Sequence, residues 1–333
     1  MPPLGIAVAG AGAFGQNHLR VLHQIGTAYL AAILETNPAR VEALAQEYPG
    51  VPVFRAQQEL LDARSRGQID LQAACVCVPT SAHLQVAGAF LAAGLDVLVE
   101  KPITPSLEEA DTLIALAQSH GCILQVGHLE RFNPAVLAVR SRIYRPMFFE
   151  AHRLSIFTPR SLDVDVVLDL MIHDLDIVLS LVDSPVRSLD AVGLPVLSGK
   201  VDIANVRIEF ESGCVANFTA SRVSTERVRK LRFFQPHQYI SIDYARQDLL
   251  FIDVKPSAPA DPSALQGGLS LARPEVAPGE PLRLEMESFI ESVSTRRAPV
   301  VSGREGREAL ALALRINASI RQHAERAHLD RFA

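Results

Sequence analysis

Short apolar runs and amphipathic stretches alternate along the first 127 residues of the chain. Strand-like apolar runs lie at residues 5–9, 30–34, 69–78, 95–99 and 122–126. Apolar positions at helical spacing between them predict helices at residues 16–25, 82–93 and 106–120. This alternation predicts an α/β fold with a doubly wound parallel sheet and right-handed crossovers over residues 1–127.

After residue 127 the pattern changes to alternating strands that follow one another without helices between them. We expect such strands at residues 147–154, 204–210, 215–221 and 239–243, and helices at residues 135–143, 166–179, 282–296 and 306–323. Residues 255–280 are rich in Pro, Ala and Ser and are interpreted as a long loop. The pattern predicts a second α/β domain over residues 128–333 with a largely antiparallel open sheet, whose C-terminal helices can pack back on the first domain.

The composition is that of an ordinary globular protein and excludes several function classes. With 333 residues the chain is long for one core, and 48% of its residues are hydrophobic and 21% charged. The net charge is −5 and the longest basic cluster, residues 227–230, is short, which argues against nucleic-acid binding. No apolar run reaches the roughly 20 residues of a membrane helix, and the N-terminus lacks the basic segment of a signal peptide, so we expect a cytoplasmic protein without membrane partners. The four cysteines show no metal-ligand spacing and are interpreted as reduced core residues.

A glycine motif of the form G-x-G-x-x-G, residues 10–15, joins the first strand to the first helix. In such a motif Gly10 makes the tight turn, Gly12 lets the backbone approach a pyrophosphate, and Gly15 lets the helix pack closely on the strand. The free N–H groups and the positive potential of the helix N-terminus favour the phosphates. The motif therefore predicts a Rossmann dinucleotide-binding domain, and the alternative is a glycine-rich turn without a ligand.

An acidic residue ends the second strand. Glu35 lies 20 positions after Gly15, where a carboxylate accepts a hydrogen bond from the ribose 2′-hydroxyl of NAD and repels the 2′-phosphate of NADP. We therefore favour NAD over NADP as the cofactor. Arg40 keeps NADP open as the alternative, because a guanidinium can pair with the 2′-phosphate.

A charged pair follows the buried strand at residues 95–99. Glu100 and Lys101 come directly after this strand, and ligands of parallel sheets lie beyond the carboxyl ends of the strands. Pro102 restricts Lys101 to extended geometry, and a cis Lys101–Pro102 bond is expected, since such bonds mark fixed functional turns. The alternative is a solvated Glu–Lys pair at the strand end.

Three polar residues share one stripe of an otherwise apolar helix at residues 166–179. Asp169, His173 and Asp176 lie at positions i, i+4 and i+7, so they point to one side. Polar side chains in an apolar stripe cost desolvation unless they face a crevice or each other, which predicts a functional face. One alternative is a histidine paired to aspartate at a domain interface. The other is a metal site, but the spacing lacks the H-x3-H pairing of zinc helices, and we expect no metal.

Together these motifs resemble the glucose–fructose oxidoreductase / inositol dehydrogenase (Gfo/Idh/MocA) family. The resemblance covers nearly the whole chain and rests on residues 10–15, Glu100-Lys101-Pro102, Asp169-x3-His173-x2-Asp176, Val78-Pro79-Thr80-x2-His83 and Arg131-Phe132-Asn133-Pro134. It implies an NAD(P)-dependent oxidoreductase that oxidises a secondary hydroxyl of a sugar or polyol. It also implies that Lys101 and His173 are the catalytic acid/base pair and that Asp169 helps to orient the substrate.

Residues 128–134 and 168–174 look most like the branch of this family related to UDP-N-acetylglucosamine 3-dehydrogenases. That branch implies oxidation of the sugar nucleotide to its 3-keto form, which supplies lipid A biosynthesis. A free-polyol, inositol or glucose dehydrogenase is the alternative among enzymes. A non-catalytic NAD-binding regulatory module is the alternative of another class.

The candidate site residues fall into two groups. The expected cofactor-binding residues are Gly10, Gly12, Ala13, Phe14, Gly15, Glu35, Pro79, Thr80, His83, Glu100 and Lys101, and a His83 held by backbone groups is the alternative for that residue. The candidate substrate contacts are Arg131, Asn133, Arg160, Asp169 and His173, with a structural or surface role equally open for the two arginines. His173, oriented by Asp169 or Asp176, is the preferred base and Lys101 the hydrogen-bond donor to the oxygen, with the reverse assignment left open.

The open sheet of the second domain needs its outer face covered. The family resemblance implies that subunits cover this face for one another. We therefore expect a homodimer or homotetramer formed through this sheet, with a small-molecule sugar or sugar nucleotide as the other partner.

Overall fold

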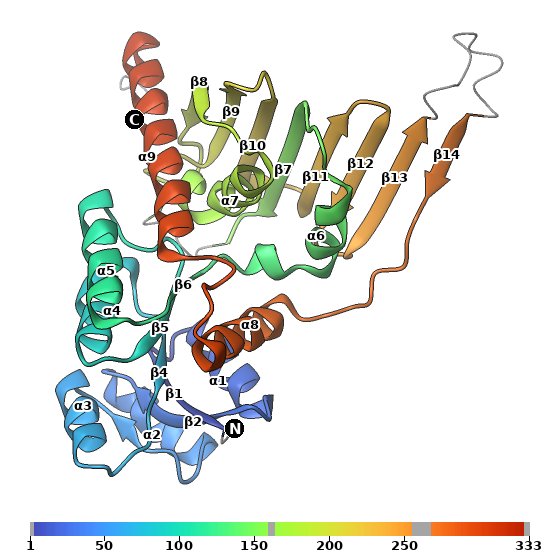
Figure 1. Ribbon diagram of the computed structural model, residues 1–333. Coiled ribbons are helices and arrows are strands. Elements are labelled where there is room, and N and C mark those ends of the chain that lie inside the picture. Colours follow the sequence, from blue (N-terminus) through green and yellow to red (C-terminus); the bar gives the residue numbers. More distant parts are fainter. Residues whose placement is uncertain (1–2, 159–163, 255–267, 330–333) are drawn as a thin grey trace. The chain divides into compact units, whose positions relative to one another are not determined.

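The computed structural model describes residues 3–158, 164–254 and 268–329, and the chain divides into two compact units (Figure 1). Unit 1 comprises Met1–Leu129 and Glu280–Leu310, and unit 2 comprises Glu130–Gly279 and Ala311–Ala333. Unit 1 therefore takes in residues 280–310, which the sequence analysis assigned to the second domain. None of the described helices is long and apolar enough to cross a membrane.

Unit 1 is a parallel sheet with helices around it. Its strands are β1 (Leu4–Ala9), β2 (Ala28–Leu34), β3 (Val53–Phe54), β4 (Ala73–Val76), β5 (Asp96–Glu100) and β6 (Leu124–Gly127). Their order is β3-β2-β1-β4-β5-β6, with every neighbouring pair parallel. This is the strand order of a Rossmann dinucleotide-binding fold, so the predicted fold of the N-terminal part is confirmed.

The helices of unit 1 are α1 (Gly15–Gln24), α2 (Pro38–Glu47), α3 (Gln57–Ser65), the short 3-10 helix η1 (Thr80–Ala82), α4 (His83–Ala92), α5 (Leu107–His120), α8 (Pro281–Thr295) and the start of α9 (Gly303–Arg326). Among them, α5 shows most clearly how capping residues set the two ends. The Ser106 side chain accepts a hydrogen bond from the Glu109 N–H and so caps α5 at its start. Gly121, with φ of 64°, ends the same helix in the left-handed conformation that glycine adopts without strain.

Helix α8 completes the apolar core of unit 1, although more than 150 residues separate it from β6 in the sequence. Met286 and Phe289 on α8 are fully buried and belong to the same core cluster as Leu19 and Leu22 on α1. Each fully buried side chain of this size contributes about 1.5–3 kcal/mol to folding. The core of unit 1 therefore requires both stretches of the chain.

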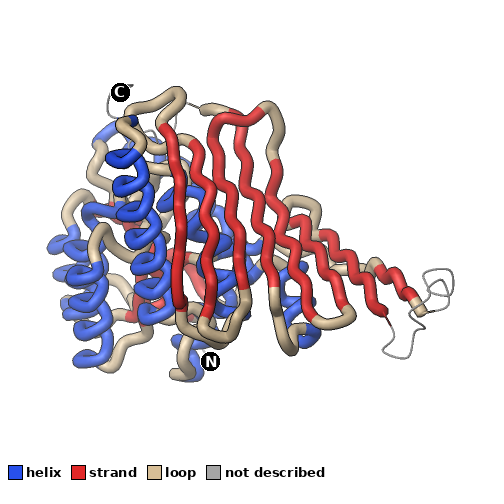
Figure 2. Tube along the Cα trace, turned by 90° about the horizontal axis from the view of Figure 1, so that it is seen from above, coloured by secondary structure: helices blue, strands red, loops and turns tan. Residues whose placement is uncertain are grey.

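Unit 2 is built on a long, mostly antiparallel sheet (Figure 2). Its strands are β7 (Phe148–Ile156), β8 (Val186–Leu194), β9 (Ile203–Phe210), β10 (Val215–Ser224), β11 (Val228–Gln235), β12 (Gln238–Asp243), β13 (Asp248–Val254) and β14 (Leu269–Ala272). Their order is β14-β13-β12-β11-β7-β10-β9-β8, and in this sheet β7 with β10 is the parallel pair among the described strands. The predicted fold class, a parallel sheet plus a largely antiparallel open sheet, is thus confirmed.

Several elements of unit 2 differ from the expectation. Strand β14 lies within residues 255–280, which were predicted to be a loop, and β8, β11 and β13 were not predicted. The described helical elements are η2 (Leu129–Phe132), α6 (Pro134–Val139), η3 (Arg140–Arg142), η4 (Val167–Met171), α7 (Ile172–Leu181) and the later part of α9. The element η4 is a π-helical turn that leads directly into α7, where a single regular helix was expected.

Candidate functional site

Every expected cofactor residue of unit 1 lies at or just beyond the carboxyl edge of the parallel sheet. The glycine loop follows β1, Glu35 follows β2, Pro79 and Thr80 follow β4, and Lys101 follows β5. The carboxyl ends of parallel strands meet at one edge, which is where such sheets bind ligands. The topology therefore brings these predicted residues to one edge of one sheet.

The three glycines of the loop meet different surroundings. Gly10 has a φ of +87°, and a Cβ there would lie 2.9 Å from the backbone of Cys77. A Cβ on Gly15 would lie 1.9 Å from the Gly10 carbonyl oxygen, so only glycine lets α1 start this close to β1. A Cβ on Gly12 would meet only the Arg40 Nη1, at 3.8 Å. The open side of Gly12 fits the close approach of a pyrophosphate, and the loop therefore suits a dinucleotide.

Glu35 connects the end of β2 to the glycine loop. Its Oε2 accepts a hydrogen bond from the Ala11 N–H at 3.0 Å, and its Oε1 accepts one from the Asn37 N–H at 2.9 Å. The carboxylate is 8% exposed, and the Arg40 Nη1 lies 3.9 Å from its Oε2. The structure thus places Glu35 at the end of β2, beside the glycine loop, where an acid is expected for NAD, and its contact with the ribose stays a prediction.

The turn after β5 has the geometry expected from the sequence. The Lys101–Pro102 peptide bond is cis, as predicted. The Glu100 Oε2 accepts a hydrogen bond from the Lys101 backbone N–H at 3.3 Å, so Glu100 holds the backbone of the residue that follows it. The role of Lys101 in the reaction stays a prediction.

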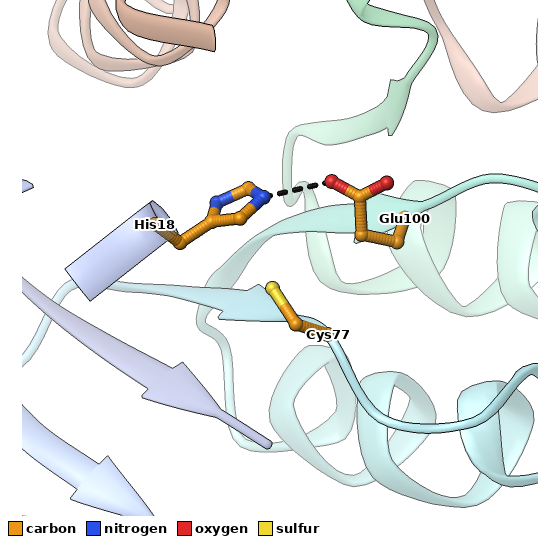
Figure 3. A group of neighbouring side chains, drawn as sticks. All are labelled: His18, Cys77 and Glu100. Carbon is orange, nitrogen blue, oxygen red and sulfur yellow. Dashed lines mark hydrogen bonds and ion pairs between the residues drawn. The ribbon is translucent and has the colours of Figure 1, made fainter. Parts of the chain in front are cut away.

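Glu100 also belongs to a buried cluster that the sequence analysis missed (Figure 3). Its Oε1 lies 2.8 Å from the Nε2 of His18, a fully buried side chain of α1. The Cys77 Sγ lies near both, and the donor atoms of the three residues are all within 4.8 Å of one another. Burial, and next the charge of Glu100, raise the pKa of the Cys77 thiol well above its ordinary value. The cluster is thus a buried histidine–carboxylate hydrogen bond beside a protonated thiol.

The His83 side chain contacts the backbone of the same turn after β5. Its Nδ1 lies 3.1 Å from the carbonyl oxygens of both Pro102 and Ile103, and its Nε2 lies 3.0 Å from the carbonyl oxygen of Val78. The ring is 1% exposed. Burial lowers the pKa of His83, although the surrounding carbonyls act in the opposite direction. The structure therefore places His83 against backbone groups, and a contact with the cofactor stays a prediction.

In unit 2, the candidate catalytic residues lie on η4 and α7. Asp169 is half-buried within the π-helical turn, and His173 is 9% exposed in the first turn of α7. Asp169 lies in the π-helical turn, whereas His173 and Asp176 lie on the regular helix α7, so the face that all three were expected to share stays a prediction.

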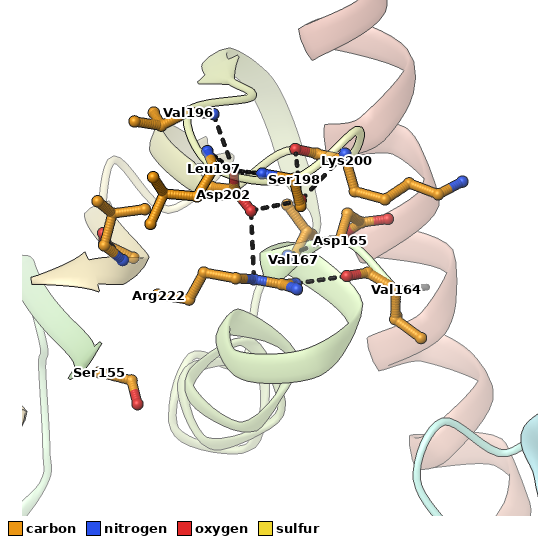
Figure 4. A network of polar contacts seen from close by, with 12 residues as sticks. Ser155, Val164, Asp165, Val167, Val196, Leu197, Ser198, Lys200, Asp202 and Arg222 are labelled. Carbon is orange, nitrogen blue, oxygen red and sulfur yellow. Dashed lines mark hydrogen bonds and ion pairs between the residues drawn. The ribbon is translucent and has the colours of Figure 1, made fainter. Parts of the chain in front are cut away.

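A polar network fixes the start of η4 (Figure 4). The Asp165 Oδ1 accepts hydrogen bonds from the N–H groups of Val167, at 2.9 Å, and Leu168, at 3.0 Å. Arg222 donates to the Val164 carbonyl oxygen, and its Nε lies 3.7 Å from the Oδ1 of Asp202. The segment that carries Asp169 is therefore anchored to β10 and to the loop before β9.

The candidate substrate residues near η2 are engaged within the protein. Arg131 is 2% exposed and forms a two-point ion pair with Asp176, through Nε at 2.6 Å and Nη2 at 3.0 Å. The Asn133 side chain caps α6 and donates to the Glu130 Oε2 and to the Tyr244 carbonyl oxygen. Asp176 is thus paired with arginine, where the sequence analysis offered it as a partner of His173. Substrate contacts of Arg131 and Asn133 stay predictions, and Arg160 lies outside the described residues.

The residues that sequence reasoning missed in unit 2 are Glu130, Arg153 and Asp174. Arg153 binds Asp174 through Nε at 2.8 Å and Nη2 at 3.0 Å, and it binds the Glu130 Oε1 through Nη1 at 3.0 Å. A signal was present, because side chains two apart on a strand share a face. Arg153 stands in register with the buried Phe149 and Ala151 of β7, so alternation alone places it inside.

A parallel sheet of this order, with a glycine loop and an acid at the end of β2, defines a dinucleotide-binding protein. Comparison with known families agrees with this class. Residues 4–128 match the model of the oxidoreductase family with an NAD-binding Rossmann fold, and residues 135–236 match the GFO/IDH/MocA C-terminal domain. The chain belongs to the GFO/IDH/MocA oxidoreductase family, and its first unit is an NAD-binding Rossmann domain.

Individual relatives cover nearly the whole chain. The UDP-N-acetylglucosamine 3-dehydrogenase of Acidithiobacillus ferrooxidans is 32% identical over 326 residues, which cover 96% of this chain and 98% of that protein. The solved structure of this enzyme, GnnA, is similar with a TM-score of 0.86, over 96% of this chain and 98% of that one. An inositol 2-dehydrogenase of Rhizobium meliloti is 25% identical over 342 residues, which cover 96% and 97% of the two chains. The predicted family, cofactor and enzyme class are therefore confirmed.

Proposed function

We propose that this enzyme oxidises the 3-hydroxyl of UDP-N-acetylglucosamine to a ketone with NAD. The observation that carries the proposal is the similarity of both units to the A. ferrooxidans enzyme, at 32% identity over 96% of this chain. The chain also has Lys101, His173 and Asp169 at the positions that the family motifs assign to chemistry. We further propose a cytoplasmic location and a place in lipid A biosynthesis, where a transaminase consumes the 3-keto product.

The protein groups divide the work of the reaction. NAD, when bound, accepts the hydride from the carbon that bears the hydroxyl. His173 removes the hydroxyl proton, because a neutral imidazole is a competent base near neutral pH. The Lys101 ammonium donates a hydrogen bond to the same oxygen and stabilises the negative charge that develops on it. Asp169 orients the substrate, and Glu100 fixes the Lys101 backbone through the 3.3 Å hydrogen bond.

The test is a panel of sugars and sugar nucleotides offered with NAD and read as NADH absorbance. We expect turnover with UDP-N-acetylglucosamine and loss of at least about 100-fold in kcat for Lys101→Met and His173→Asn, since each removes a group that acts in the transition state. Lys200→Met and His120→Asn, at exposed positions, are matched controls and keep full activity. NAD bound without turnover of any compound in the panel would contradict the proposal.

A free polyol is the second candidate substrate. The full-length similarity to the inositol 2-dehydrogenase of R. meliloti favours it, at the lower identity of 25%. Turnover of myo-inositol in the same panel, with UDP-N-acetylglucosamine inactive, would select this alternative and leave the roles of Lys101 and His173 unchanged.

We also propose that two copies of the chain associate through the open face of the unit 2 sheet. An apolar ladder crosses this face, with one residue each from β7, β11, β12, β13 and β14, directly opposite one another: Phe148, Phe234, Tyr239, Ile252 and Leu271. The Phe148 and Phe234 rings lie 5.6 Å apart, and the Phe234 and Tyr239 rings lie 5.0 Å apart. Phe234 and Leu271 are 38% and 60% exposed. An apolar strip of this length favours burial against another surface.

Two charged pairs lie on one side of this apolar ladder. Arg232 pairs with Glu150 at 3.1 Å, and Lys230 lies 4.0 Å from Asp243, on the same face. A face that combines an apolar strip with charged pairs is typical of protein interfaces, and the balanced charges let an identical surface approach.

The oligomer is tested by light scattering after gel filtration. We expect a dimer or tetramer for the wild-type chain, and smaller species for Phe234→Glu and Leu271→Glu, because each places a charge in the ladder. Val196→Glu is the control, since Val196 is 54% exposed outside the ladder. A monomeric wild-type chain would contradict this part of the proposal.

A further inference from the structure

A network of buried charges surrounds the start of α7 in unit 2. It consists of five residues that are each no more than 5% exposed: Glu130, Arg131, Arg153, Asp174 and Asp176. Charged groups are costly to bury unless they are paired in good geometry. Their concentration beside His173 is therefore the feature of the described chain that most requires an explanation beyond packing.

The network holds α7 through two ion pairs, Arg131–Asp176 and Arg153–Asp174, each of which is called an arm. Arg131, on η2, grips Asp176 through two hydrogen bonds of 2.6 and 3.0 Å. Arg153, on β7, grips Asp174 through two hydrogen bonds of 2.8 and 3.0 Å. A planar guanidinium that binds a carboxylate at two points fixes both the distance and the angle between the groups.

The arms reach α7 on both sides of His173. At about 100° of rotation per residue, Asp174 projects about 100° to one side of His173, and Asp176 about 60° to the other. A rotation of α7 about its axis would lengthen the hydrogen bonds of both arms. The direction in which His173 projects is thus set by two carboxylates that are each held from a different element.

The second arm is itself held in place, because Arg153 also contacts Glu130 and Tyr244. The Arg153 Nη1 donates to the Glu130 Oε1 at 3.0 Å, and the Arg153 Cζ lies 5.2 Å from the centre of the Tyr244 ring. The Asn133 Nδ2 donates to both the Glu130 Oε2, at 3.2 Å, and the Tyr244 carbonyl oxygen, at 3.0 Å. Burial alone would lower the pKa of Arg153, but Asp174 and Glu130 raise it overall, so the guanidinium keeps its charge.

Helix α7 begins directly after a π-helical turn, so contacts from other elements help to fix its first turns. The π-helical turn η4 precedes α7, so the first residues of α7 do not continue a regular hydrogen-bond ladder. The Asp165 cap holds the far end of η4, and the two arginines hold the first turns of α7. His173 lies between these anchors.

We infer that Arg131 and Arg153 are positioning residues for catalysis, which fix the orientation of His173 through Asp176 and Asp174. This inference rests on the catalytic role proposed for His173. A base displaced by about 1 Å can cost about 100-fold in rate. The arginines therefore act on kcat without touching the substrate.

Two variants separate the effect of the two-point contact of Arg131 from the effects of its charge and of protein stability. Arg131→Lys keeps the charge but loses the two-point grip. The double variant Arg131→Met with Asp176→Leu removes both charges, and such replacements of a buried ion pair are often neutral for stability. The matched control is Arg307→Lys in unit 1, where Arg307 grips Asp111 in the same two-point manner, at 2.5 and 3.0 Å, on the surface.

We expect both Arg131 variants to fold, to bind NAD as the wild type does, and to lose about tenfold or more in kcat with KM changed less than about twofold. Arg307→Lys keeps the wild-type kcat. Wild-type kcat in the folded double variant would overturn the inference, since the pair would then be only structural. A raised KM with unchanged kcat would also overturn it, because Arg131 would then contact the substrate.

A second readout keeps this test separate from the proposed function. The ¹⁵N signals of the His173 ring, assigned with His173→Asn, report its order without substrate. One sharp set in the wild type and broadened or multiple sets in the Arg131 variants support the inference even if no sugar in the panel is oxidised. Unchanged ring signals in the double variant would overturn it.

Discussion

Alanine substitutions at Gly15 and Gly12 should separate two roles of the glycine loop, which are the packing of α1 on β1 and the approach of a pyrophosphate. In Gly15→Ala the new Cβ would lie 1.9 Å from the Gly10 carbonyl oxygen and 3.4 Å from the Cys77 Cβ, so α1 must move away from β1. Overpacking of this kind costs about 1–3 kcal/mol. At about 2–4 °C per kcal/mol, the melting temperature should fall by roughly 2–12 °C. NAD affinity should also fall, because the start of α1 moves.

Gly12→Ala should behave differently. Its Cβ would meet only the Arg40 Nη1, at 3.8 Å, so the folded chain accepts it without strain. The methyl group fills the open side where a pyrophosphate must approach, and we expect at least a tenfold loss of NAD affinity, about 1.4 kcal/mol, at an unchanged melting temperature. Gly26→Ala, with nothing within 4 Å of its Cβ, is the control for both measurements.

The assays are differential scanning fluorimetry without ligand and calorimetric titration with NAD. The reasoning is refuted if Gly15→Ala melts within about 1 °C of the wild type, or if Gly12→Ala is destabilised as much as Gly15→Ala. The first result would mean that the loop accommodates a Cβ at position 15 despite the close Gly10 carbonyl oxygen. The second would mean that Gly12 is also needed for packing within the folded chain.

Three further outcomes are expected. Glu35→Ser should weaken NAD and improve NADP, because Arg40 stays beside a site that no longer repels a 2′-phosphate; an unchanged ratio of kcat/KM for the two cofactors would count against the role of Glu35. Burial alone would raise the pKa of Asp202, but hydrogen bonds from Ser198, Val196 and Leu197 lower it to about 2. The stabilisation is therefore present above the unfolded pKa of about 3.9 and is lost as pH falls towards 2, so the difference in melting temperature between wild type and Asp202→Asn should shrink from pH 6 to pH 3. Phe289→Ala should cost about 3–5 kcal/mol in urea unfolding, and a cost below about 1 kcal/mol would show that α8 is not part of the core.

Local patterns allowed the fold of unit 1 and its glycine loop to be predicted. Gly10, Gly12 and Gly15 act within one turn, and their spacing contains the information that the backbone needs. Ser106 and Gly121 likewise mark the two ends of α5 by capping. The cis bond at Pro102 followed from the same local reasoning.

Partners distant in the sequence could not be predicted in this way. No local pattern connects His18 with its partner Glu100, which lies 82 residues later. Arg131 was offered as a substrate contact because its partner Asp176, 45 residues further on, is not visible in any local pattern. The π-helical turn before α7 was missed for another reason, because the apolar spacing of residues 166–179 fits a regular helix and carries no sign of the change.

The discontinuity of unit 1 has a consequence for synthesis of the chain. Its parallel sheet is complete once Leu129 has been made, but Glu280, just before α8, follows 151 residues later. At about 5–20 residues per second, a ribosome needs roughly 8–30 s to supply that helix. During this interval the nascent sheet lacks the apolar cover that Met286 and Phe289 later provide. The larger part of unit 2, Glu130–Gly279, is therefore synthesised before unit 1 can close, and the apolar surface of the N-terminal sheet that α8 covers stays open for that time.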